Sequence, residues 1–208
     1  MNLDVTLYVI TDSNMEEAEL LTRVQEACMH GASIIQLREK TKTTSAMIAL
    51  AKKVKQITDH FDIPLIIDDR LDVALAINAS GVHVGAEDMD VATARRLLGP
   101  DKIVGATAKT VETALQAQAD GADYLGVGAI YPTTTKVKTK ITSVETLSAI
   151  TQACDIPVAA IGGLQHGNLD VLKESGIAGV CVVSAIMKAE DAGAAVCELK
   201  SEIEALLN

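Results

Sequence analysis

Short apolar runs alternate with segments of helical spacing along the whole chain. Most of these runs are too short for a helix and too apolar for a strand with one solvent-exposed face. They are therefore typical of parallel strands buried on both faces. The predicted strands cover residues 6–11, 33–37, 64–68, 82–85, 103–107, 124–130, 157–163 and 179–186.

The segments between the runs carry apolar residues at three- and four-residue steps, as Leu21, Val24 and Cys28 do, and this spacing predicts helices. A glycine stands just before four of the predicted strands, and glycine tolerates the left-handed conformation that ends many helices. These glycines are Gly31, Gly81, Gly121 and Gly176.

Eight units of strand and helix predict a single (β/α)8 TIM barrel of class α/β, with one domain over residues 1–208. A doubly wound open sheet is the main alternative. It would more often place a G-x-G-x-x-G turn after its first strand, and the segment "VITDSNMEE" contains no glycine.

Composition narrows the class of partner. The chain of 208 residues has 18 basic and 28 acidic side chains, and its formal net charge of -10 argues against nucleic-acid and anionic-membrane partners. Four cysteines occur without a C-x-x-C pair, and no signal peptide or long apolar run is present. The sequence therefore predicts a cytoplasmic protein, and it leaves homo-oligomerisation open.

Polar residues gather where the predicted strands end, and in a barrel these carboxyl ends meet at one mouth. Gln36, Arg38 and Lys40 are two residues apart, so their side chains point the same way while the strand lasts. An Arg and a Lys that point into the barrel mouth need an anion to balance their charge. The alternative is a surface salt bridge with Glu39 or with a neighbouring helix.

Two carboxylates follow adjacent predicted strands, at Asp69 and Asp88. They would repel each other at one rim unless a cation lay between them, and Mg²⁺ accepts one or two carboxylates together with water and phosphate oxygens. The alternative makes Asp68, Asp69 and Asp72 caps of the next helix and Asp88 a loop residue.

Groups that suit phosphate follow three later strands. Residues 162–163 are glycines and residues 183–184 are Val-Ser, at the place where this fold often binds phosphate. The loop "GAIYPTTTKVKTK" adds hydroxyl and ammonium donors at Thr133, Thr135 and Lys136. Two phosphorylated groups in one cavity suggest a transferase. His83, on a predicted buried strand, is interpreted as a packed side chain rather than a base.

An ordered set of motifs resembles the thiamine-phosphate synthase family. The motifs are "QLREK", "DDRLDVALAINASGVHVGAEDM", "VGATAKT", "GVGAIYPTTTK", "PVAAIGG" and "VCVVSAI". The resemblance implies a (β/α)8 barrel that joins hydroxymethylpyrimidine diphosphate to a thiazole monophosphate. Pyrophosphate leaves first, a pyrimidinylmethyl cation forms, and the thiazole nitrogen captures it to give thiamine monophosphate.

The resemblance also implies roles for single residues. The positions that match the family's pyrimidine diphosphate site are Gln36, Arg38, Lys40, Asp68, Thr107 and Lys136. The thiazole phosphate would be held by Gly163, Val183 and Ser184, with Thr133 and Thr135 beside the substrates. Mg²⁺ would bind to Asp69 and Asp88, and the catalytic cations would be Arg38, Lys40 and Lys136.

The chain departs from the family pattern at three positions. Asp68 stands where Asn is usual, Thr107 where Ser is usual and Lys109 where His is common. An ionised Asp cannot donate a hydrogen bond as Asn does. Two other functions stay open: a thiazole tautomerase, which would need an acid–base side chain and no metal pair, and a non-catalytic barrel that binds a phosphorylated ligand.

Overall fold

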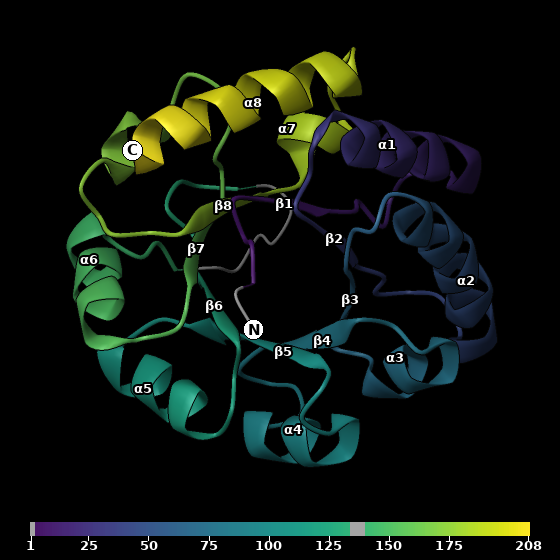
Figure 1. Ribbon diagram of the computed structural model, residues 1–208, viewed down its shortest axis with the longest axis horizontal. Helices are drawn as coiled ribbons and strands as arrows, with labels where there is room; N and C mark the ends of the chain where they lie inside the picture. The colour runs from purple at the N-terminus through teal and green to yellow at the C-terminus, as the bar shows by residue number, and fades with distance from the viewer. Residues whose placement is uncertain (1–2, 134–139) are drawn as a thin grey trace.

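The structure, a computed structural model, describes residues 3–133 and 140–208. Within these residues eight parallel strands close into a barrel, each paired with its neighbours in chain order (Figure 1). The strands are β1 (Leu7–Ile10), β2 (Ile34–Leu37), β3 (Leu65–Asp68), β4 (Gly81–Val84), β5 (Ile103–Ala108), β6 (Tyr124–Gly128), β7 (Val158–Ile161) and β8 (Gly179–Val182). The predicted (β/α)8 class is confirmed.

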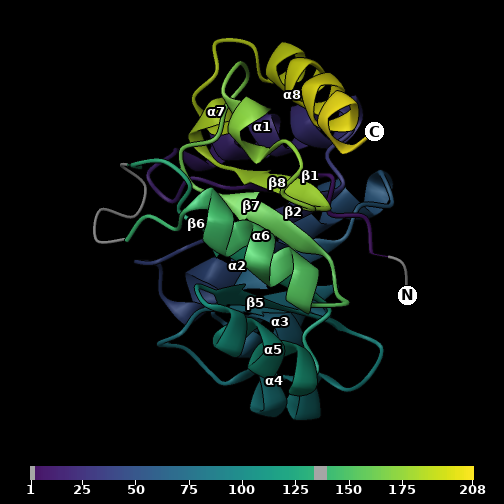
Figure 2. The same cartoon turned by 90° about the vertical axis from the view of Figure 1, so that its left-hand side faces the viewer.

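Helices surround the barrel on its outside, and Figure 2 shows the same arrangement from the side. The helices are α1 (Glu17–His30), α2 (Thr44–His60), α3 (Leu71–Ile77), α4 (Val91–Leu98), α5 (Val111–Ala119), α6 (Val144–Ala153), α7 (Ser184–Met187) and α8 (Ala192–Leu207). None of the helices in the described part of the chain has the length and apolar character needed to cross a lipid bilayer.

The segment after β7 differs from the predicted repeat, because it contains only a short 3₁₀ helix, η1 (Leu169–Leu172). Gly162, Gly163 and Gly167 have φ values of 102°, 69° and 82°. Residues in this left-handed region cannot continue an α-helix. The chain therefore crosses from β7 to β8 through turns, and α7 and α8 both follow β8.

Glycine ends helices at two of the predicted places, since Gly31 and Gly121 have φ values of 107° and 97°. The prediction for Gly81 is wrong. α3 ends instead at Asn78, which takes the left-handed conformation at φ 52°, and Asn is the other residue that tolerates it. Gly81 lies within β4, where a Cβ atom would overlap the backbone of Ile103.

Alternation along the strands creates two apolar layers. Leu7 and Val9 of β1 face outward and belong to the core between strands and helices, whereas Tyr8 and Ile10 face into the barrel. The buried members of the inner cluster are Val5, Tyr8, Ile10, Ile34, Ile66, Ile103, Tyr124, Ala159 and Cys181. The interior is thus a packed core.

Gly105 of β5 should be the glycine whose replacement disturbs this interior most directly, because a Cβ atom there would overlap the ring of Tyr124. We expect Gly105→Ala to lower the free energy of unfolding by about 1–3 kcal/mol through overpacking. We expect Gly99→Ala, at a left-handed position with open space around it, to cost about 1 kcal/mol.

Urea unfolding measures both changes. Near-ultraviolet circular dichroism separates their causes, because the chain has three tyrosines and no tryptophan. The Gly105→Ala spectrum should change and the Gly99→Ala spectrum should not. An unchanged tyrosine spectrum in Gly105→Ala would contradict the overlap.

Candidate active site

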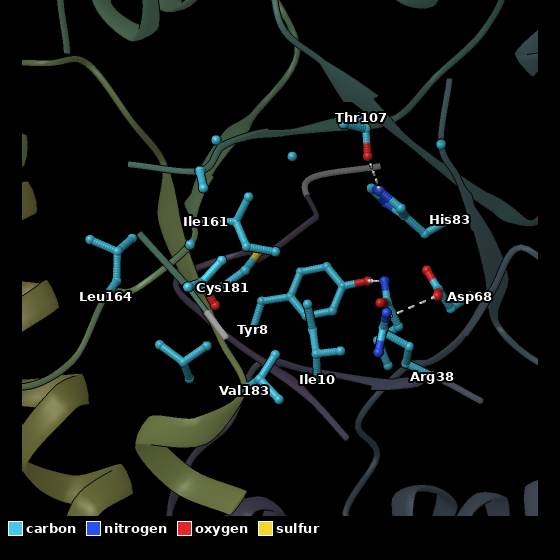
Figure 3. A pocket seen from close by; sticks show the side chains of 18 of the residues that line it. Tyr8, Ile10, Arg38, Asp68, His83, Thr107, Ile161, Leu164, Cys181 and Val183 are labelled. Carbon is cyan, nitrogen blue, oxygen red and sulfur yellow. Dashed lines mark hydrogen bonds and ion pairs between the residues drawn. The ribbon is translucent and has the colours of Figure 1, made fainter. Parts of the chain in front are cut away.

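A cavity of about 190 Å³ opens at the carboxyl ends of the strands (Figure 3). Each strand contributes to its wall, so residues from the whole length of the chain meet there. The predicted site residues that line it are Gln36, Arg38, Lys40, Asp68, Asp69, Asp88, Thr107, Thr133, Gly163, Val183 and Ser184. Thr135 and Lys136 lie outside the described residues.

Cations and carboxylates neutralise each other on one side of this cavity. Lys40 Nζ lies 2.8 Å from Asp68 Oδ2 and also pairs with Asp69. Arg38 Nε lies 3.6 Å from Asp68 Oδ2, and Figure 3 shows the two side chains facing each other. Burial opposes the charge of Lys40, but the attraction of Asp68 and Asp69 outweighs it and raises the pKa of Lys40.

The predicted alternative for these cations, a surface salt bridge with Glu39, is wrong. Glu39 pairs with Lys42 at 3.4 Å, and its side chain is only 1% exposed. Among the described residues neither of its carboxylate oxygens has a hydrogen-bond partner. Because neighbours along an extended chain point to opposite sides, Glu39 faces away from the cavity that Arg38 and Lys40 line.

Asp69 and Asp88 lie side by side at the rim. Burial, and then the adjoining Asp69 carboxyl group, raise the pKa of Asp88. Asp88 Oδ2 accepts a hydrogen bond of 3.0 Å from the backbone of Gly85, and Asp69 turns the chain after β3 with a left-handed φ of 58°. Two carboxyl groups held together in this way suit a shared cation.

The alternative role of Asp68, Asp69 and Asp72 as caps of the next helix is also wrong, whereas Asp88 does lie in the loop between β4 and α4. The residue before α3 is Arg70, and no side chain caps this helix by a hydrogen bond. Asp72 instead pairs with Arg70 at 2.6 Å. Within residues 3–133 and 140–208 no group of three or more His, Cys, Asp or Glu side chains could hold a metal. A metal here would rely on two carboxylates, water and ligand oxygens.

A chain of hydrogen bonds lies at the floor of the cavity, and all its members except the buried Tyr124 line the cavity. Gln36 Nε2 donates to the hydroxyl of Tyr8 at 2.7 Å, and this hydroxyl lies 2.7 Å from that of Tyr124. The Tyr124 hydroxyl lies 3.0 Å from His83 Nδ1, and His83 Nε2 lies 3.0 Å from Thr107 Oγ1. His83 is half-buried, and its ring also lines the cavity; its interpretation as a packed side chain rather than a base stays a prediction.

Sequence analysis did not select Tyr8 or Tyr124 as site residues. The available signal was that two of the three tyrosines in the chain stand on predicted strands that are otherwise apolar. A buried tyrosine hydroxyl needs a hydrogen-bond partner, so two such residues indicate a polar cluster inside the barrel.

The other side of the cavity is formed by the loops after β6, β7 and β8. A Cβ atom at Gly163 would lie 2.6 Å from Tyr131 Cβ and 2.9 Å from Pro132 O, so the first two loops touch. Val183 and Ser184 stand at the start of α7. Backbone groups of these loops are thereby gathered around a common space.

The comparisons with known proteins agree with this arrangement. Residues 7–186 match the family model described as thiamine monophosphate synthase. The chain belongs to this family. It is 49% identical to the thiamine-phosphate synthase of Lacticaseibacillus paracasei, over 98% of this chain and 96% of that one. It is 54% identical to thiamine-phosphate synthase 2 of Streptococcus pneumoniae serotype 4, over 89% of each chain.

A solved structure supports the same family. The thiamine phosphate pyrophosphorylase of Pyrococcus furiosus superposes with a TM-score of 0.90 at 38% identity, and the match covers 99% of this chain and 98% of that one. The resemblance seen in the sequence is thus confirmed. The chain is a transferase of thiamine biosynthesis.

Asp68 should weaken anion binding, because its carboxylate already neutralises Arg38 and Lys40. We expect Asp68→Asn to tighten the binding of inorganic pyrophosphate by about three- to tenfold in the presence of a chelator. Isothermal titration calorimetry at neutral pH measures this. Asp72→Asn, which removes the exposed pair with Arg70, is the matched control. Weaker or unchanged binding in Asp68→Asn would contradict this role.

Proposed function

We propose that this enzyme condenses hydroxymethylpyrimidine diphosphate with hydroxyethylthiazole phosphate to form thiamine monophosphate and pyrophosphate. The observation that carries the proposal is one cavity with two unlike sides. One side combines Arg38 and Lys40 with the carboxyl pair of Asp69 and Asp88, and the other is built from loop backbone around Gly163 and Ser184. The first suits a diphosphate and the second a monophosphate.

The task of the cationic side chains is to neutralise charge on the leaving group. In a dissociative substitution negative charge grows on the departing pyrophosphate, and fixed positive groups stabilise it. Arg38 and Lys40 can do this once the diphosphate takes the place of Asp68 and Asp69 as their partner. The cation left on the pyrimidine needs a site with little water, and Ile10, Ile161 and Val182 line the cavity.

Asp69 and Asp88 are the residues that would hold Mg²⁺. Burial is the main cause that raises the pKa of Asp88, and the adjoining carboxyl group of Asp69 raises it further. A divalent cation between the two carboxyl groups would relieve their repulsion. A set of two carboxylates is the kind of site in which Mg²⁺ takes its other ligands from water and phosphate. When bound, Mg²⁺ supplies positive charge for the diphosphate.

The thiazole phosphate would bind at the loops after β7 and β8, through Gly163, Val183 and Ser184. The loops after the seventh and eighth strands and a short extra helix often form a phosphate site in this fold, and α7 is such a helix. Thr133, Thr135 and Lys136 would contact the substrates and the leaving group from the loop after β6. The single domain, the cytoplasmic location and the oligomeric state stay predictions.

Incubation of the protein with both substrates and Mg²⁺ tests the proposed function directly. We expect stoichiometric release of pyrophosphate together with a product that has the mass of thiamine monophosphate. Conversion between thiazole tautomers without coupling would instead support a tautomerase. Binding of both phosphorylated compounds without conversion would support a non-catalytic role.

Asp88→Asn should abolish the Mg²⁺ dependence of turnover together with most of the turnover. Asn keeps an oxygen for the hydrogen bond from Gly85 but loses the charge, so we expect kcat to fall by about a hundredfold or more. Binding of Mn²⁺ in the presence of pyrophosphate, followed by electron paramagnetic resonance, should weaken in parallel.

The control for this change is Asp90→Asn. Asp90 caps α4 by accepting a hydrogen bond from the backbone of Thr93 at 2.8 Å, and, unlike Asp88, it is not one of the residues that line the cavity. Both kcat and Mn²⁺ binding should stay near the wild-type values in this variant. Full activity of Asp88→Asn in excess chelator would contradict a metal role for Asp88.

A further inference from the structure

The chain of hydrogen bonds on the cavity floor connects two residues of the proposed pyrimidine site, Gln36 and Thr107. Tyr8, Tyr124 and His83 lie between them, and every link is 2.7 or 3.0 Å long. We propose that these three residues form a relay that sets which polar group Gln36 and Thr107 each present to the substrate. The relay thereby selects an aminopyrimidine over a pyrimidine that carries oxygen in place of the amino group.

The direction of the relay follows from counting protons. Gln36 Nε2 donates to the Tyr8 hydroxyl, so Tyr8 has its single proton left to donate to Tyr124. Tyr124 in turn has one proton for Nδ1 of His83. Neutral imidazole then carries its proton on Nε2, and Nε2 donates to Thr107 Oγ1. A buried hydroxyl that donated to nothing would be costly, which favours one unbroken direction.

Burial keeps the two tyrosines in the protonated state that this direction needs. Tyr8 and Tyr124 are 1% and 0% exposed. Burial is the main cause that raises the pKa of both hydroxyls well above the usual value for tyrosine. Each hydroxyl therefore has one proton to pass along the relay at neutral pH.

The neighbouring strands leave room for the relay at two glycines. A Cβ atom at Gly105 would overlap the Tyr124 ring, and one at Gly126 would lie 3.3 Å from His83 Cε1. The ring centroid of Tyr124 lies 5.5 Å from that of Tyr8 and 5.6 Å from that of His83. Space at the centre of the barrel is thus occupied by polar aromatic rings where apolar side chains would otherwise pack.

The two ends of the relay present opposite groups to the cavity. Gln36 gives one of its two Nε2–H groups to Tyr8, and this bond fixes the orientation of the amide so that its oxygen is an acceptor for a ligand. Because Thr107 Oγ1 accepts from His83, its own proton is the donor that remains. An aminopyrimidine carries an amino donor and ring-nitrogen acceptors, which match this pair. A pyrimidinone reverses the pattern, with an oxygen acceptor and a ring N–H donor, and would leave buried groups unpaired.

Tyr124 is a positioning residue in this scheme, since its ring is fully buried and it lies outside the cavity lining. The selection rests on the proposed function, and the test compares kcat/KM for the aminopyrimidine diphosphate with that for the oxygen analogue. We expect Tyr124→Phe to lower this ratio by about tenfold or more, with the KM for thiazole phosphate changed by less than about twofold.

Tyr131→Phe is the matched control, because it removes a tyrosine hydroxyl that donates a hydrogen bond of 3.3 Å to the backbone oxygen of Asn168, outside the relay. Its selectivity ratio should equal that of the wild type. An unchanged ratio in Tyr124→Phe would show that the network is purely structural and would overturn the proposed selection.

A second measurement needs no variant and no substrate. Nitrogen-15 chemical shifts of labelled histidine report which ring nitrogen carries the proton, and the chain contains four histidines. We expect neutral His83 with its proton on Nε2; the opposite tautomer or a charged ring would overturn the relay. If the wild type releases no pyrophosphate, the proposed function and the substrate selection fail together, and the tautomer alone then decides whether the relay exists.

Discussion

Closure of the barrel is the constraint on which the site depends. Eight parallel strands that close on themselves must turn every second side chain into one shared interior. Toward the amino ends of the strands this interior contains Ile34, Ile66 and Ile103. The hydroxyls of Tyr8 and Tyr124 meet 2.7 Å apart, nearer the mouth. The floor of the cavity is therefore the upper layer of the core, and Tyr8 both packs in that core and lines the cavity.

Most of the fold could be read from the sequence because strand and helix periods differ so clearly. The apolar runs locate all the strands to within a few residues, as 33–37 does for β2 (Ile34–Leu37). The errors in predicting helix ends fall where more than one residue type can take the required backbone conformation, or where a glycine is needed for another reason. Asn78 ends α3 in place of a glycine, and Gly81 is required by the close approach of Ile103, a contact between strands that no local pattern reveals.

The convergence of the predicted residues on one cavity could also be read from the sequence, since these residues follow strands whose ends must meet. The partners of those residues could not. Tyr8 and Tyr124 are 116 residues apart, and only the strand register brings their hydroxyls together. Similarly, the charge of Asp68 was visible, but its position between Arg38 and Lys40 depends on side-chain directions at two strand ends. The contacts of Thr135 and Lys136 stay predictions.

The position of Asp68 and Asp69 has a consequence for the order of events in the proposed reaction. Lys40 is held by both carboxylates, so an anion must compete with them for its charge. A ligand with one negative charge gains little from this exchange. A diphosphate accompanied by Mg²⁺ gains more, because a cation at Asp69 and Asp88 would draw Asp69 away from Lys40 and leave Lys40 to the leaving group. Metal and diphosphate would then bind cooperatively, through a residue that both must share.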